Sequence, residues 1–83
     1  MNIEFDPAKD LINREKHGIS LARVVDLEGI IVVKDDRFAE SRFRLYGAID
    51  GLPHCAAVVF RGGKVRVISL RRAHRKEYRR HVR

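Results

Sequence analysis

The feature that most limits the fold of this chain is a change in hydrophobic period at Gly29. From there to Leu70, strand-like runs follow one another with only short polar or glycine-containing connections between them. Strands joined by such turns pair antiparallel, so this part of the chain predicts a small antiparallel meander. Because 83 residues can enclose only one core, we expect a single domain over residues 1–83.

Four runs have the composition of strands: residues 29–33, 42–46, 54–60 and 65–70. The first is a compact β-branched run and predicts a buried strand. The second alternates, so that Phe43 and Leu45 face away from Arg44 and Tyr46. The last run also alternates, which places Ser69 on its apolar face.

A helix signal precedes the meander. Asp6 can cap a helix whose first residue is a proline, and Gly18 has the position of a C-terminal cap. These signals predict a helix over residues 7–17. Its apolar residues, which include Leu11 and Ile12, repeat on one face in the pattern of an amphipathic helix.

Three further segments complete the expected fold. Residues 1–5 alternate like a short strand, and Ser20 can cap a second, shorter helix that ends near residue 28. The residues from Arg71 onward predict a basic helix. The expected class is therefore α+β: a small antiparallel meander with two N-terminal helices and one basic C-terminal helix, the helices lying on one side of the sheet.

The net charge of +7 is concentrated at the C-terminal end. Residues 71–83 hold seven basic side chains and one acid, Glu77, and so carry +6 of it. Such a patch predicts a polyanionic partner, which can be a nucleic acid, an anionic membrane surface or an acidic protein. The alternative is a solvated tail that aids solubility. If Arg71 and Arg72 begin the helix, its dipole disfavours them and a docked polyanion would relieve the repulsion.

The other side of this expected helix is polar rather than purely apolar. It carries His74, Glu77, Tyr78 and His81, and such groups are costly to bury unpaired. We therefore expect them to be paired or to line a cleft. Local hydrogen bonding at an exposed helix edge is the alternative for any one of them.

Several function classes lack support in the sequence. No run of 18 apolar residues exists for a membrane span, and the N-terminus lacks a signal-peptide pattern. The single cysteine, Cys55, cannot form a disulfide within the chain, and His74 with Glu77 alone makes a weak metal site. We expect no metal, no cofactor and no membrane contact, and a cytoplasmic location.

Metal-free RNA cleavage fits the residue types that remain. RNA supplies its own nucleophile, the 2′-hydroxyl, so a protein need only move protons and stabilise charge. A base among His17, Glu77 or His74 would activate that hydroxyl, while Arg66 and Arg71 would stabilise the phosphorane. A non-catalytic RNA- or DNA-binding module, and a protein whose basic helix only docks an acidic partner, remain alternatives.

Segments spread over almost the whole chain also carry a family resemblance. They are residues 5–9, 13–20, 40–42 with Gly47, and 65–77. Within them, Asn-x-x-Lys-His-Gly begins at Asn13, and Arg-x-Ile-Ser-x-Arg-x-Ala-x-x-x-Glu begins at Arg66. Together these blocks resemble the BrnT-type ribonuclease toxins of type II toxin–antitoxin systems, which have a RelE-like fold.

The resemblance implies a cytoplasmic bacterial toxin that cuts RNA and blocks translation. It also implies a cognate antitoxin of the ribbon-helix-helix type, similar to BrnA, which would cover the basic face. Operator DNA would be bound only through the toxin–antitoxin complex.

The candidate residues form two sets. The catalytic candidates are His17, Arg66, Arg71, His74, Glu77 and Tyr78. The candidates for RNA contact are Lys16, Arg42, Arg72, Arg75, Lys76 and Arg79. Structural roles compete with these: Lys16 and His17 can compensate a helix dipole, and Arg42 can pair with Glu40.

Overall fold

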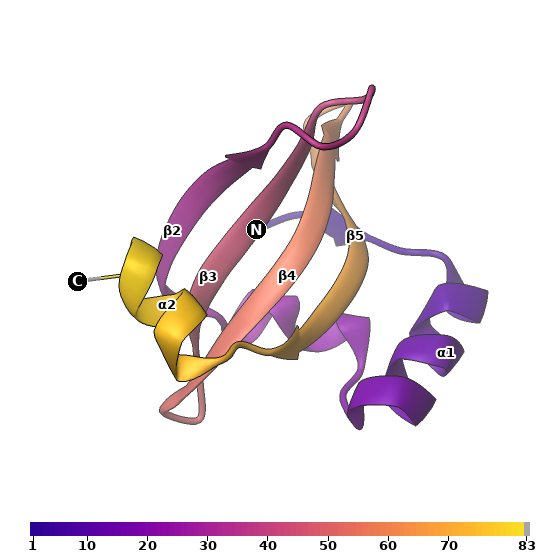
Figure 1. Cartoon of the computed structure of the whole chain (residues 1–83). Helices are drawn as coiled ribbons and strands as arrows, with labels where there is room; N and C mark the ends of the chain where they lie inside the picture. The colour runs from indigo at the N-terminus through magenta and orange to yellow at the C-terminus, as the bar shows by residue number, and fades with distance from the viewer. Residues whose placement is uncertain (83) are drawn as a thin grey trace.

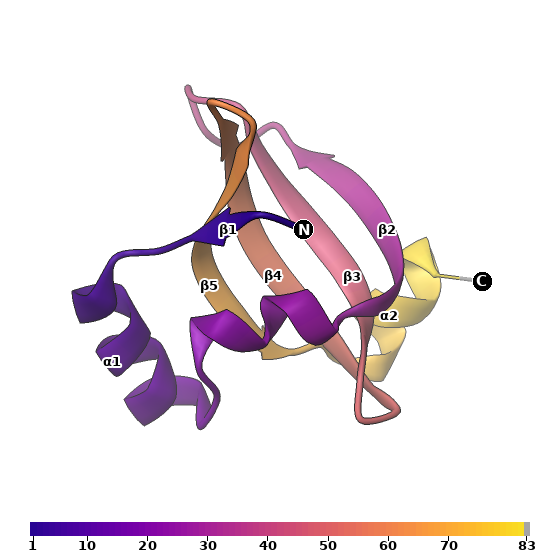
Figure 2. The same cartoon turned by 180° about the vertical axis from the view of Figure 1, so that it is seen from behind.

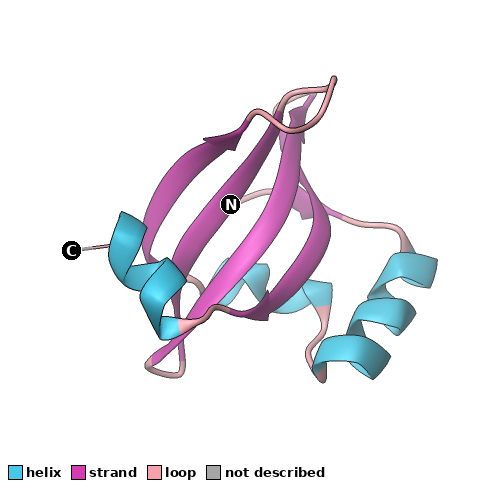
Figure 3. Cartoon of the chain, viewed as in Figure 1, coloured by secondary structure: helices cyan, strands magenta, loops and turns pink. Residues whose placement is uncertain are grey.

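The computed structural model describes residues 1–82 (Figures 1 and 3). Its elements are β1 (Ile3–Glu4), α1 (Pro7–His17), the 3₁₀ helix η1 (Leu21–Asp26), β2 (Glu28–Asp35), β3 (Arg42–Ile49), β4 (Leu52–Arg61), β5 (Lys64–Arg72) and α2 (Arg75–His81). The strands form one sheet in the order β1-β5-β4-β3-β2. The predicted α+β class is confirmed, and β2 to β5 form the predicted antiparallel meander.

The sheet is mixed rather than wholly antiparallel. Strand β1 lies beside β5 and runs parallel to it, with Ile3 opposite Val65. No short turn joins these two strands, so the rule that predicted antiparallel pairing does not apply to this edge.

The helices lie on both faces of the sheet, and the expectation that they share one side is wrong. Figure 2 shows η1 across one face, while α2 lies on the opposite face seen in Figure 1. The reason is that each face carries buried side chains that need cover. On the α2 face these are Tyr46, Cys55 and Ala73, with Tyr78 and Val82 packed against them.

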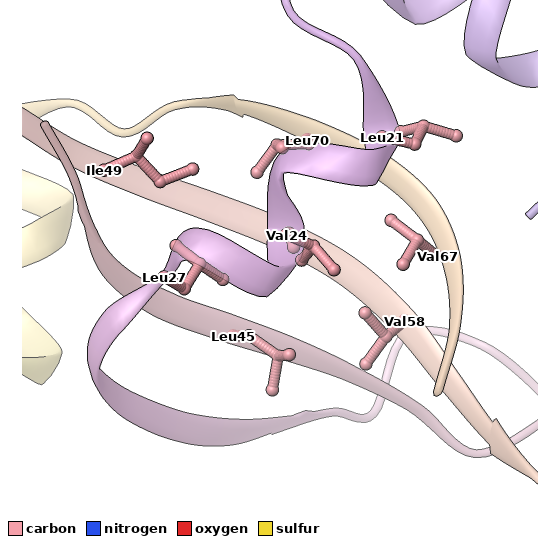
Figure 4. Close-up of a cluster of buried hydrophobic side chains, with 9 residues drawn as sticks. Leu21, Val24, Leu27, Leu45, Ile49, Val58, Val67 and Leu70 are labelled. Carbon is pink, nitrogen blue, oxygen red and sulfur yellow. The ribbon is translucent and has the colours of Figure 1, made fainter. Parts of the chain in front are cut away.

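The main core lies between η1 and the sheet (Figure 4). Leu21 and Val24 of η1 are fully buried there, as is Leu70 of β5. The other buried members are Leu27, Leu45, Ile49, Ala56, Val58 and Val67. Ser20 caps η1 as predicted, by accepting a hydrogen bond from the amide of Ala22. The η1 face of the sheet is therefore filled by the core, which leaves the opposite face for a functional site.

Helix α1 has the predicted bounds and caps, but its packing differs from the amphipathic pattern. Leu11 and Ile12 are 60% and 62% exposed, whereas Asn13 is 4% exposed. The Asn13 amide donates to the carbonyl oxygens of Leu70 and Ile19, at 2.8 and 2.9 Å, and its oxygen accepts from the Leu70 amide at 3.1 Å. A polar anchor, rather than an apolar face, therefore attaches α1 to β5.

Strand β2 is an edge strand, and the prediction of a buried strand is wrong. Ile31 and Val32 are 40% and 53% exposed. A β-branched run satisfies the preferences of an edge strand as well as those of a central one, so composition could not separate them. The sheet order decides the matter because β2 has only β3 as a neighbour.

Strand β5 contains a β-bulge at Ile68. Consecutive residues of β4 pair with Ser69 and Val67, which leaves the residue between them without a partner. The extra residue shifts the alternation by one position, so Leu70 enters the core and Arg71 emerges on the opposite face. The unbroken alternation that placed Ser69 on the apolar face is wrong for this reason.

The basic C-terminal helix begins later than predicted. Arg71 and Arg72 belong to β5, and the Ala73 amide still donates to the carbonyl oxygen of Pro53 in β4, at 3.0 Å. Helix α2 starts only at Arg75. The repulsion expected between two leading arginines and the helix dipole is therefore absent, since those arginines are extended. The last basic residue of the predicted helix, position 83, lies outside the described residues.

Candidate functional site

An open cleft of about 800 Å³ is lined by residues from the end of α1, from β3, from the end of β5 and from α2 with the residue before it. Its lining residues are Lys16, His17, Arg44, Arg71, Arg72, His74, Glu77, Arg80 and His81. Six of the twelve predicted site residues are among them. The lining combines five lysine or arginine side chains and three histidines with a single carboxylate, so the cleft has the electrostatic character of an anion-binding site.

The carboxylate of Glu77 is the centre of the cleft's hydrogen-bond network. Arg71 donates to both of its oxygens, at 3.0 and 2.9 Å, in a bidentate pair. The Tyr46 hydroxyl donates to Oε2 at 2.7 Å, and an Arg44 nitrogen lies 3.8 Å from the same atom. One side chain of α2 is thereby held by residues of β3 and β5.

These contacts keep Glu77 ionised. The hydrogen bonds from Arg71 lower the pKa of the Glu77 carboxyl to about 2, with further help from Tyr46, although partial burial opposes the change. The same pair raises the pKa of Arg71. A carboxylate that binds protons so weakly is a poor general base near neutral pH, so its chemistry here is to hold Arg71 in place.

Tyr46 links this network to a histidine. Its hydroxyl accepts a hydrogen bond from Arg44 at 2.9 Å and donates to Glu77. Burial, above all, raises the pKa of Tyr46, so it remains a neutral donor. The His81 ring is stacked on the Tyr46 ring, with centroids 4.7 Å apart and planes inclined by 20°. The position of His81 in the cleft depends on this buried aromatic ring.

Lys16 and His17 reach the same cleft from the end of α1. Both are exposed. Both also lie in the last turn of the helix, where basic side chains compensate the helix dipole, as their structural alternative predicted. Desolvation, together with the positive charges of Lys16 and Arg71, lowers the pKa of His17. The imidazole is therefore in its proton-accepting form at neutral pH, which suits a general base.

Two predicted arginines lie outside the cleft. Arg66 has an ion pair with Glu4 of β1 at 3.7 Å, and it borders a different hollow. Arg42 donates to Glu40 at 2.8 Å, as its structural alternative predicted. The hypothesis that Arg66 and Arg71 stabilise the phosphorane together requires them to lie in one site. In the structure they border different hollows.

The other predicted residues of α2 do not border the cleft. Tyr78 packs against the buried cluster of the α2 face. The side chains of Arg75, Lys76 and Arg79 are exposed. Their roles in catalysis or RNA contact stay predictions.

Four of the lining or supporting residues are not among the predicted site residues: Arg44, Tyr46, Arg80 and His81. The alternation of β3 gave one usable signal, because it placed Arg44 and Tyr46 on the face away from the core. That this face meets α2 could not be read from either segment alone.

Within residues 1–82, no group of three or more histidine, cysteine or acidic side chains is placed to hold a metal ion. In the same part of the chain, no helix combines the length and apolar character needed to cross a membrane. Cys55 is buried beneath the cleft face, and this burial raises the pKa of its thiol.

The fold and cleft define a small, basic α+β protein with a cationic site built around histidines and a bidentate arginine–glutamate pair. Residues 5–77 match the family model of the ribonuclease toxin BrnT of type II toxin–antitoxin systems. The chain belongs to this family.

A solved structure supports the assignment. The Brucella abortus ribonuclease toxin BrnT is similar over 90% of this chain and 99% of its own, with 25% sequence identity and a TM-score of 0.74. No curated protein sequence matches the chain.

Proposed function

We propose that this protein is an endoribonuclease toxin that cleaves RNA without a metal ion, by attack of the 2′-hydroxyl on the adjacent phosphate. The observation that carries the proposal is that one cationic cleft is lined by His17 of α1, Arg71 of β5, His81 of α2 and His74, the residue just before α2. Family membership adds the ribonuclease activity as an expectation for this chain.

In the proposed reaction, neutral His17 accepts the proton of the 2′-hydroxyl. The 2′-oxygen forms a bond to phosphorus, the bond from phosphorus to the 5′-oxygen breaks, and a protonated group donates a proton to that leaving oxygen. The products are a 2′,3′-cyclic phosphate and a 5′-hydroxyl. His74 and His81 are the candidates for the acid because both line the cleft opposite α1.

Arg71 supplies the charge that the phosphorane needs. Its guanidinium is held by Glu77 and borders the cleft, so a phosphate can be bound there without reorganising the site. Lys16, Arg72 and Arg80 surround this position and would bind the adjacent phosphates. We assign Glu77 a positioning role, through Arg71 and Tyr46, in place of the role of base.

The remaining proposals concern the protein's setting. We propose a cytoplasmic toxin with the RelE-like arrangement, neutralised by a ribbon-helix-helix antitoxin similar to BrnA that covers the cationic cleft. The toxin would then bind operator DNA only as part of the complex with its antitoxin. The support is family membership and the exposed positive charge of α2.

The test incubates purified protein with a single-stranded RNA in EDTA and identifies the products by mass spectrometry. We expect a 2′,3′-cyclic phosphate, and no cleavage where a 2′-deoxynucleotide replaces the nucleotide at the scissile bond. His17→Ala and Arg71→Ala should lose most activity. Arg23→Gln is the matched control, because Arg23 pairs with Asp26 and Asp50 away from the cleft.

Other outcomes would overturn the proposal. Binding that weakens with salt but leaves the RNA intact would indicate a nucleic-acid-binding module. Absence of any RNA affinity would indicate a protein-docking role for the basic face. Full cleavage by both cleft variants would place the reaction elsewhere.

A further inference from the structure

A second hollow, of about 220 Å³, adjoins the cleft on the same face of the sheet. The two share Arg44 and Arg71 as lining residues, so one anionic ligand can extend from the cleft into the hollow and contact positively charged side chains throughout. The remaining residues that line it are Asp35, Arg37, Phe38, Arg42, Cys55, Ala57, Ile68 and Ser69.

The central strands give this hollow small side chains. Cys55 and Ala57 of β4 and Ser69 of β5 line it, between the larger side chains of the loop after β2 and of Arg71. The bulge at Ile68 brings Ser69 to this face. Small side chains between larger ones leave space for a flat group.

Phe38 is an aromatic side chain on the loop side of the hollow, and it is 42% exposed. The Arg42 guanidinium lies over its ring, 4.1 Å from the centroid, and that of Arg37 is 5.5 Å away. Aromatic rings beside arginines are the usual surface on which proteins stack bases of single-stranded nucleic acids.

The loop that carries Phe38 is held by a buried carboxylate. Asp35 is 6% exposed and accepts hydrogen bonds from Arg37 Nε and Nη2, at 2.9 and 2.7 Å, and from its amide at 3.2 Å. The phenylalanine therefore extends from an anchored turn, which reduces the entropy lost when a ligand stacks on it.

We propose that this hollow is a nucleobase subsite of the RNA cleft, with Phe38 as the stacking surface and Arg42 as its cationic partner. The proposal rests on the proposed function, because the base belongs to the strand whose phosphate lies at Arg71. It specifies the substrate as single-stranded RNA, since a base must leave a duplex to stack on a side chain.

The test measures binding of a short 2′-O-methyl RNA, which lacks the attacking hydroxyl and cannot be cleaved by the proposed route. Phe38→Ala should weaken binding about fivefold or more, the lower limit for loss of a base–aromatic stack. Phe38→Tyr should bind within about twofold of the unchanged protein, because it retains the ring. This measurement needs no activity, so failure of the cleavage proposal would not obscure it.

A series of the same oligonucleotides, each lacking one base, separates stacking from a structural effect. One member should bind the unchanged protein and Phe38→Ala equally well, because the base that stacks is missing. Phe60→Ala is the matched control: Phe60 is 48% exposed but packs with Phe43 on the η1 face, so RNA affinity should not change.

Unchanged RNA affinity of Phe38→Ala would overturn the subsite. So would an equal loss of affinity with every member of the series, since Phe38 would then act only on loop structure. A loss confined to binding of a protein partner would assign the hollow to that partner instead.

Discussion

At the scale of single residues, the site depends on how two arginines and a tyrosine surround one carboxylate. Glu77 has the residue type of a general base, but Arg71 and Tyr46 lower its pKa to about 2 and occupy both of its oxygens. For His17, desolvation and then the positive charges of Lys16 and Arg71 lower the pKa, which leaves the imidazole free to accept a proton. The surroundings, and not the residue types, separate their roles.

We expect His17→Ala to lower kcat for RNA cleavage by about 10²- to 10⁴-fold, the usual contribution of a general base. In the unchanged protein, the acidic limb of the kcat/KM profile should rise with pH through a pKa below the ordinary histidine value of 6.5, because the neutral form of His17 is active. At higher pH the profile should fall again as the proposed acid loses its proton. A pH–rate profile measures this. A profile that falls with pH over the same range would contradict the assignment.

At the scale of elements, α1 and β5 are joined by hydrogen bonds from one buried amide. Asn13→Ala would remove the partners of the Leu70 amide and carbonyl, so it should lower the free energy of unfolding by about 2–4 kcal/mol. Urea denaturation measures the change. Leu11→Ala on the same helix is the control and should stay within about 0.5 kcal/mol, because Leu11 is 60% exposed.

The start of β2 crosses close to β3 at Gly47. A Cβ atom there would lie 2.9 Å from the carbonyl oxygen of Glu28 and 3.2 Å from the Leu27 side chain, so the backbone itself would have to move. We expect Gly47→Ala to lower the free energy of unfolding by about 1–3 kcal/mol, as overpacking commonly does. An unchanged urea midpoint would show that β2 can shift without loss.

At the scale of the whole molecule, stability depends on carboxylates paired with arginines. In the folded protein the pKa values of Glu77 and Asp35 are about 2, against ordinary values of 4.5 and 3.8, and in each case an arginine hydrogen bond is the main cause. Their stabilisation is complete above the ordinary values. It is lost as the pH falls toward 2, because the unfolded chain binds protons first.

We therefore expect the free energy of unfolding to fall from about pH 4.5 to pH 2, as measured by urea denaturation at each pH. Glu77→Gln should flatten this dependence, since the amide cannot titrate. Glu15→Gln, at an exposed position of α1, is the matched control and should reproduce the original slope. An unchanged slope in Glu77→Gln would contradict the argument.

The sequence by itself determined the parts of this protein that depend on neighbouring residues. The caps Asp6 and Gly18 defined α1, and short turns defined the order of the meander. The clustered charge predicted a polyanionic partner, and the two sequence blocks indicated the BrnT family. All of these signals act over a few residues or survive as patterns in the sequence.

Only the tertiary structure decided which side chains meet. The bulge at Ile68 turns Arg71 out of the core, and the packing of α2 on the far face brings Glu77 to it and to Tyr46. The edge position of β2 and the anchoring of α1 through Asn13 were decided in the same way. The physical reason is that these contacts join residues far apart in sequence, and their faces depend on register and layer order, which no local pattern contains.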